Sequence, residues 1–239
     1  MRLNQKLGCA ALCAALMVAS GFAETLDEVT QKLEQQLKDI KSLSADMKMT
    51  VDVQQGDMKQ NAVMDGKMSG TQRDGKYYSR SEATINMEMQ MGEQSQKMSG
   101  NMLSVADGEF LWVVRDLGQK QIIKQKIDDL PPLGTDYVKK MKEDNELTLG
   151  ENATVDGQEC WVIVATPKKR DPMGPPVSKM KYYFRQSDGV IVKTEGLDEE
   201  GKVFMTMTLS NIKVNPSLSE SDFKFEVPKD ANVMDMTNM

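Results

Sequence analysis

The sequence predicts an α+β protein, mainly β, in which one strongly curved antiparallel sheet is covered by amphipathic helices. Three observations predict this fold class. Most of the chain alternates apolar and polar residues with a period of two, as a strand with one buried face does. Turns that contain glycine separate these runs at regular intervals. Two other segments place apolar residues three and four apart, which is the spacing of an amphipathic helix.

The first predicted helix begins near Thr25, where Thr-Leu-Asp-Glu fits a capping box. In this motif the Thr25 side chain caps free backbone amides and the Glu28 side chain reaches back to the start of the helix. Its apolar residues form one stripe, and Gln, Lys, Glu and Asp occupy the other face. We expect the stripe to cover the sheet. It consists of Leu26, Val29, Leu33, Leu37 and Ile40.

The predicted strands occupy most of the remaining chain, and one segment interrupts them. The interruption, 130–145, opens with Pro131-Pro132 and continues with Tyr137, Val138 and Met141, which predicts a second helix. No linker or repeat divides the chain, so residues 24–239 are expected to form a single domain. The predicted strands are 45–53, 62–68, 77–91, 97–105, 110–114, 119–125, 159–166, 180–185, 190–197, 203–214 and 223–228.

Residues 1–23 have the order of a secretory signal. Basic Arg2 and Lys6 precede a short apolar stretch, which is followed by small residues ending at Ala23. We therefore expect cleavage after Ala23 and a periplasmic location. The whole chain has a net charge of −6, and removal of the two basic residues makes it more acidic. Such a protein has no long-range attraction to nucleic acid, which is not an expected partner.

The composition argues against most enzyme classes. The chain contains no histidine, which excludes Ser-His-Asp and Cys-His catalysis and imidazole metal ligands. We predict that the protein is not an enzyme, and we predict no cofactor and no set of metal ligands. Cys160 is the one cysteine outside the signal, and the apolar sequence around it predicts a buried strand residue.

Methionine is unusually frequent, with 20 residues in the chain. The sequence Met87-Glu-Met89-Gln-Met91 places three thioethers on one strand face. Three interpretations remain open. Methionine fills irregular gaps in cores, its flexible side chain suits a surface that adapts to varied cargo, and its thioether is a ligand for copper(I).

The order of motifs resembles that of the LolA/LolB-like lipoprotein carriers. An amphipathic helix leads into Ser-Ala-Asp-Met at 44–47, and Gln-Arg-Asp-Gly-Lys-Tyr-Tyr follows at 72–78. The stretch 105–112 reads Val-Ala-Asp-Gly-Glu-Phe-Leu-Trp, and residues 222–235 close the chain with Phe-Lys-Phe-Glu-Val-Pro near their start. The resemblance implies an unclosed β-barrel with helices as a lid over an apolar cavity.

The resemblance also implies a function. It implies a monomeric periplasmic carrier that holds acyl chains of lipoproteins or lipids for transfer towards the outer membrane. A membrane-protein donor and an outer-membrane acceptor would be its partners. It further implies a latch for the lid at Arg73, with Arg80 as a substitute. Two other functions stay open, namely a methionine-rich copper(I)-binding protein and a lipid- or peptide-sensing module of an envelope signalling system.

The residues expected to line the cargo cavity come from both predicted helices and from the methionine-rich strands. They are Leu26, Val29, Leu33, Leu37, Ile40, Met47, Met49, Met64, Met87, Met89, Met91, Trp112, Tyr137, Met141, Met205 and Met207.

Overall fold

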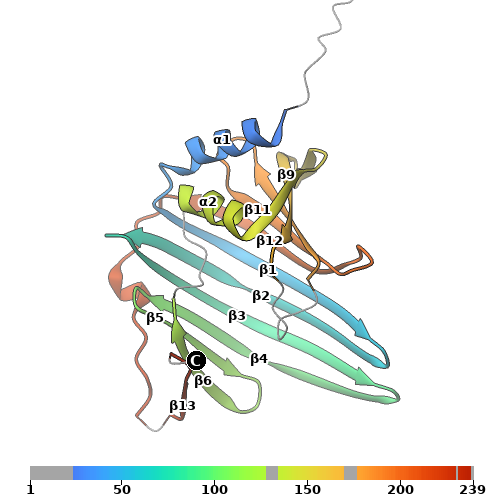
Figure 1. Ribbon diagram of the computed structural model, residues 1–239. Helices are drawn as coiled ribbons and strands as arrows, with labels where there is room; N and C mark the ends of the chain where they lie inside the picture. Colours follow the sequence, from blue (N-terminus) through green and yellow to red (C-terminus); the bar gives the residue numbers. More distant parts are fainter. Residues whose placement is uncertain (1–23, 128–133, 170–176, 230, 238–239) are drawn as a thin grey trace, which may run out of the picture.

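A computed structural model describes residues 24–127, 134–169, 177–229 and 231–237 (Figure 1). The expected signal segment and its cleavage site lie outside the described residues, and so do residues 130–133 of the segment expected to form the second helix. Within the described ranges, no helix is both long enough and apolar enough to span a membrane.

Helix α1 spans Leu26–Leu37, and the capping box at its start is confirmed. The Thr25 hydroxyl accepts a hydrogen bond from the Glu28 amide, and the Glu28 carboxylate accepts one from the Thr25 amide at 2.7 Å. The apolar stripe is buried from Val29 onwards, Leu26 is half-buried, and Val29 and Leu33 are fully inaccessible to solvent. The second predicted helix is confirmed as α2, Thr135–Asp144.

The strands form a single sheet whose longest members are consecutive hairpins. Asp74 and Gly75 join β2 to β3 with positive φ angles of 50° and 75°, as a tight hairpin turn requires. The first strands are β1 Ser42–Gln55, β2 Met58–Arg73, β3 Lys76–Met91, β4 Gln94–Asp107, β5 Phe110–Asp116 and β6 Lys120–Lys126. The later ones are β7 Asn145–Leu149, β8 Ala153–Val155, β9 Gln158–Pro167, β10 Lys179–Arg185, β11 Ile191–Leu197, β12 Val203–Val214 and β13 Val233–Asp235.

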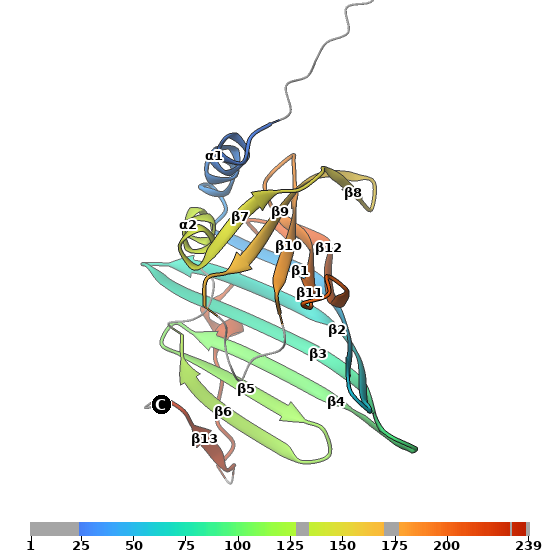
Figure 2. The same ribbon diagram turned by 45° about the vertical axis from the view of Figure 1, so that its right-hand side comes forward.

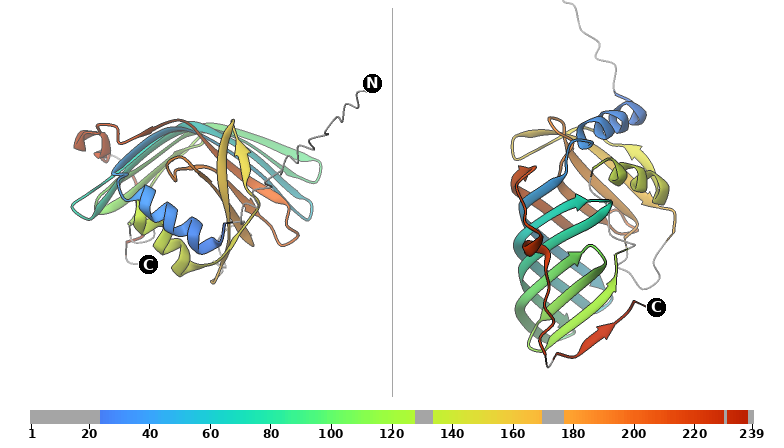
Figure 3. Two further views of the ribbon diagram at one scale, coloured as in Figure 1. Left: turned by 90° about the horizontal axis from the view of Figure 1, so that it is seen from above. Right: turned by 90° about the vertical axis from the view of Figure 1, so that its left-hand side faces the viewer.

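The sheet contains 13 strands in the order β13-β6-β5-β4-β3-β2-β1-β12-β11-β10-β9-β7, with β8 paired to β9. The mainly β, α+β architecture is therefore confirmed. Strands β7 and β13 stand at opposite ends of this order, so the sheet has two edges. Seen from above, the sheet arches over α1 and α2, which both lie on its concave side (Figure 3, left).

The expectation of a wholly antiparallel sheet is wrong at the C-terminal end. Strand β13 pairs with β6 in the parallel direction. The strand expected at 223–228 is also wrong, because a 3-10 helix, Glu220–Phe223, is followed by residues without strand pairing. Phe223 and Phe225 pack on sheet aromatics instead of joining the ladder. This segment runs across the convex face (Figure 3, right).

The main core lies where the two helices meet the second half of the sheet (Figure 2). Val29 and Leu33 of α1 and Val138 of α2 pack with Trp161 of β9 and Phe184 of β10. At the surface, the Lys142 ammonium lies 2.8 Å from the Glu34 carboxylate and joins α2 to α1. The helices are therefore held both to each other and to one part of the sheet.

Candidate functional site

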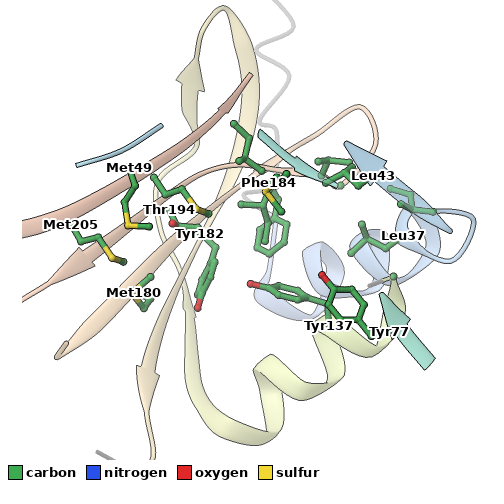
Figure 4. Close-up of a pocket in the computed structure, with 18 residues that line it drawn as sticks. Leu37, Leu43, Met49, Tyr77, Tyr137, Met180, Tyr182, Phe184, Thr194 and Met205 are labelled. Atoms are coloured by element: carbon green, nitrogen blue, oxygen red, sulfur yellow. The ribbon is translucent and has the colours of Figure 1, made fainter. Parts of the chain in front are cut away.

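A cavity of about 370 Å³ lies between the helices and the concave face of the sheet (Figure 4). Its volume falls within the range of small-molecule sites, which is about 300–1,000 Å³. It is lined by Leu37, Ile40, Leu43, Met49, Met68, Tyr77, Gly134, Tyr137, Met180, Tyr182, Phe184, Gly189, Val190, Ile191, Thr194, Met205, Met207 and Leu209.

The sheet wall of this cavity follows from strand register. Met49 of β1 pairs directly with Met207 of β12, and Leu209 lies two residues farther along the same strand. Directly paired residues point to the same face of a sheet, so these side chains stand next to one another. Figure 4 shows Met49, Met180 and Met205 together at one side of the cavity. Methionine thioethers therefore make up a substantial part of the sheet wall, together with leucine and aromatic side chains.

The helix wall is formed where α1 ends and α2 begins. Leu37, the last residue of α1, and Ile40, which follows the helix, continue the apolar stripe and line the cavity. Tyr137 stands in the first turn of α2. Gly134 precedes that turn with a φ of 74°, and an added Cβ would lie 3.3 Å from the Leu37 carbonyl oxygen. The close approach of the two helix ends closes the cavity on this side.

Aromatic rings from α2 and β10 form the floor. The rings of Tyr137 and Tyr182 are 6.3 Å apart and nearly perpendicular, and Phe184 lies 6.5 Å from Tyr137. Burial raises the pKa of Tyr137 well above its ordinary value, and the neighbouring Tyr182 adds to this effect. Burial also raises the pKa of Tyr182 and of Tyr77. All three hydroxyls therefore stay uncharged across the physiological pH range.

None of the described residues that line the cavity carries a charge. Its polar side-chain groups are the hydroxyls of Tyr77, Tyr137, Tyr182 and Thr194, and Thr194 is 5% exposed. A charged ligand group inside the cavity would lose its hydration without gaining an ionic partner, which is costly. An apolar ligand would lose only unfavourable contact with water. The lining of the cavity therefore favours apolar groups over charged ones.

Part of the expected cavity set lines the cavity. From the helices it includes Leu37, Ile40 and Tyr137, and from the sheet Met49, Met205 and Met207. Other expected residues lie in the adjoining core. Val29, Leu33 and Met141 are buried between the helices and the sheet, with Leu26 packed at their edge. Met47 is buried beside Ala83 and Leu209, and Met64 packs against that cluster.

Two expected site residues lie on the convex face, away from the cavity. Trp112 pairs with Val105, and the strand register places both side chains on the face opposite to the cavity methionines. Its ring packs 5.3 Å from Phe225, and its indole N–H donates to Asp107 at 2.8 Å. Arg73 donates to the Leu218 carbonyl oxygen on the segment after β12. Its guanidinium therefore faces the C-terminal segment and not the helices in this conformation.

Met87, Met89 and Met91 also lie outside the cavity, although they share its face of the sheet. They occupy the end of β3 that extends away from the helices (Figure 1). Met91 is 63% exposed, and Met87 and Met89 are half-buried.

Several residues that line the cavity were not predicted from the sequence, although the alternation of apolar residues along a strand groups some of them. Met180, Tyr182 and Phe184 alternate along β10 and point together into the cavity. Alternation assigned them to one face, but no sequence signal showed which face the helices cover. The other missed residues are Leu43, Met68, Tyr77, Gly134, Gly189, Val190, Ile191, Thr194 and Leu209.

Cys160 is buried, as expected from the apolar strand around it. Its thiol belongs to a separate small core with Val162, Tyr183 and Val192. Burial raises the pKa of the Cys160 thiol, so the reactive thiolate is disfavoured.

Comparisons with known proteins give distant similarities. A family model described as that of an uncharacterized protein matches residues 134–226. No curated protein matches the sequence. Among solved structures, an uncharacterized conserved protein from Thermus thermophilus is 15% identical, with a TM-score of 0.47 over 87% of this chain and 98% of that one.

Two further structures have similar coverage. LprF from Mycobacterium bovis is 12% identical, with a TM-score of 0.44 over 81% of this chain and 96% of that one. A LolA superfamily protein from Nitrosomonas europaea is 12% identical, with a TM-score of 0.31 over 85% of this chain and 99% of that one. A LolA superfamily structure is therefore among the structural neighbours of this chain.

Proposed function

We propose that the protein is a non-enzymatic periplasmic carrier that binds acyl chains of lipoproteins or lipids for transfer towards the outer membrane. The observation that supports this proposal best is the uncharged cavity between the helices and the sheet. The arched sheet with two open edges serves as an unclosed barrel, and α1 and α2 serve as its cover. A membrane-protein donor would load the cavity and an outer-membrane acceptor would empty it.

The energetics of such a carrier require that binding and release be nearly balanced. Each methylene that leaves water gains about 0.8 kcal/mol, so a long chain binds strongly to any dry apolar cavity. A cavity wall of methionines suits a carrier because flexible thioethers adapt to different chains and close over the space when it is empty. Met49, Met68, Met180, Met205 and Met207 supply that wall.

The helices differ in how firmly they are attached, which bears on release. Val29 and Leu33 of α1 are fully buried in the main core, whereas Leu37 and Ile40 belong to the same core but also border the cavity. We therefore propose that the cavity opens where the end of α1 contacts the start of α2, at Leu37 and Gly134. The N-terminal part of α1 would remain in place as an anchor.

The first test asks whether the protein carries lipid. The full chain is purified from the periplasm of an expressing bacterium, extracted with organic solvent and analysed by mass spectrometry. We expect acyl lipid in a stoichiometric amount. A lipid-free protein that also fails to bind an apolar fluorescent fatty acid would contradict the proposal.

The second test fills the cavity without changing the rest of the surface. Met207→Trp places a larger ring among Met49 and Leu209, whereas Thr208→Trp adds the same ring on the opposite face of the same strand. Displacement of about two methylenes of ligand corresponds to about tenfold weaker binding. We expect this loss for Met207→Trp in a fluorescent fatty-acid titration and little change for Thr208→Trp. Equal affinity of the two variants would exclude the cavity as the binding site.

A further inference from the structure

The register of the sheet places every methionine of β1–β4, β10 and β12 on one face. Met49 pairs with Met64 and Met207, Met64 pairs with Ile85, and Ile85 pairs with Gly100. Residues two apart along a strand point to the same face. On each strand, therefore, either the odd-numbered or the even-numbered residues share the face of Met49. Met180 joins the same face through Gly196, which pairs with Met205. The set is Met47, Met49, Met58, Met64, Met68, Met87, Met89, Met91, Met98, Met102, Met180, Met205 and Met207.

Five of these methionines form a separate group, which we call the tip cluster: Met58, Met87, Met89, Met91 and Met98. They stand near the hairpin ends of β1–β4, which extend away from both helices (Figures 1 and 2). Apart from Met91, which is mostly exposed, they are half-buried. None of them lines the cavity under the helices. The proposed acyl-chain site therefore does not account for them.

The neighbours of the tip cluster are polar, which argues against a simple hydrocarbon surface. Met89 pairs with Gln60 on one side and with Gln96 on the other, and Met91 pairs with Gln94. Strands are usually rich in β-branched and aromatic residues. These residues would form an apolar surface without any sulfur atom. The thioethers that stand between amide side chains are better explained if their sulfur lone pairs bind a ligand.

The spacing within the cluster suits a shared ligand. Met87 pairs directly with Met98, so their Cβ atoms are about 5 Å apart. Met89 lies two residues along the same face from Met87, at about 7 Å. Three rotatable bonds allow each thioether to turn towards a common point. The Gln60 amide donates to the Met87 sulfur at 3.3 Å from the β2 side of β3, so a metal ion held with Met98 of β4 would replace this hydrogen bond.

We propose that Met87, Met89 and Met98 bind a soft monovalent metal ion, copper(I), with Met58 and Met91 alongside as further thioethers. Neutral thioethers favour copper(I) over hard or divalent ions, since ligand softness governs this selectivity. The charged pair Glu88 and Lys97 points to the opposite face, so no carboxylate of this pair stands beside the thioethers. No group of three His, Cys, Asp or Glu residues in the described ranges is placed to hold a metal.

The test uses silver(I), which has the charge and softness of copper(I) and needs no reductant. The full chain is labelled with carbon-13 at the methionine methyl groups and titrated with silver nitrate. We expect one saturable site, with the methyl signals of Met87, Met89 and Met98 moving first. Absence of a saturable site tighter than micromolar would overturn the proposal. Earlier movement of the Met205 and Met207 signals would also overturn it, because the ion would then lie in the cavity.

Sulfur removal separates the metal site from an apolar surface. The triple variant Met87→Leu, Met89→Leu and Met98→Leu keeps side-chain volume and apolar character but has no ligand sulfur there. We expect at least a tenfold weaker affinity for silver(I) and unchanged binding of the fluorescent fatty acid. Met234→Leu is the control outside the cluster and should keep the wild-type affinity. Unchanged silver affinity in the triple variant would refute the site, and the methyl shifts of the wild type test it even if that variant unfolds.

Discussion

The two ends of the concave face use the same side chain in different surroundings. At the covered end, Met49, Met205 and Met207 face aromatic rings and the ends of two helices. At the open end, Met87 and Met89 face glutamines and solvent. The groups opposite a methionine, and not the density of methionines in the sequence, therefore decide which ligands its side chain can meet.

The largest expected difference between the two ends is in stability. Phe184 is fully buried between Tyr137 and Tyr182, so Phe184→Ala should lower the free energy of unfolding by about 3–5 kcal/mol. Met89→Ala removes a half-buried side chain at the open end and should cost less than about 1 kcal/mol. Urea unfolding measures both values. Similar losses would show that the open end is also part of the folding core.

An intermediate effect is expected at the boundary between the ends. Gly66 of β2 pairs with Met47 and Ala83, and a Cβ on Gly66 would lie 2.6 Å from the Ala83 Cβ. Gly66→Ala should therefore force the strands apart and cost about 1–3 kcal/mol. The neighbouring Lys67→Ala, at an exposed position on the opposite face, is the matched control. Equal stability of the two variants in urea would mean that the sheet can relax at this point.

The smallest effect concerns pH and is confined to the covered end. Hydrogen bonds from Lys32 and from the Trp161 indole hold the pKa of the Glu24 carboxyl below 4.5. A lowered folded-state pKa gives stabilisation that is present above the unfolded value and is lost as the pH falls through the folded value. Because the pair with Lys32 is partly exposed, its contribution should be less than about 1 kcal/mol.

Glu24→Gln should remove this part of the acid sensitivity. The measurement is urea unfolding above and below pH 4.5, followed by Trp161 fluorescence in a Trp112→Phe background. The wild type should lose more stability than the variant as the pH falls. An identical acid profile for both proteins would show that the contact of Glu24 with Trp161 adds nothing to the attachment of α1.

The sequence was sufficient for the local parts of the fold. The capping motif placed the start of α1, and period-two alternation located strands such as β3 and β10. Alternation also grouped Met87 with Met89 and Met205 with Met207. These features depend on neighbours in the chain, so residue types and spacing contain them.

The candidate site was only partly predictable because it depends on which face is covered. Both faces of β5 are apolar, so alternation could not show that Trp112 points to the convex side. The reason lies far away in the chain, where Phe225 covers Trp112. In the same way, no local signal distinguished the methionines under the helices from those of the tip cluster. Long-range pairing and the position of the helices decide both questions.

The position of these methionines on one face of the sheet also restricts how the strands can change length. A single-residue insertion within β2 or β3 would turn the residues beyond it to the opposite face of the sheet. Met64 or Met87 would then exchange places with the polar residues beside it, and the methionines beyond the insertion would leave the concave face. Insertion of two residues would keep the parity and lengthen the sheet. Lineages that carry this fold should therefore vary hairpin length in steps of two residues where the methionines are retained.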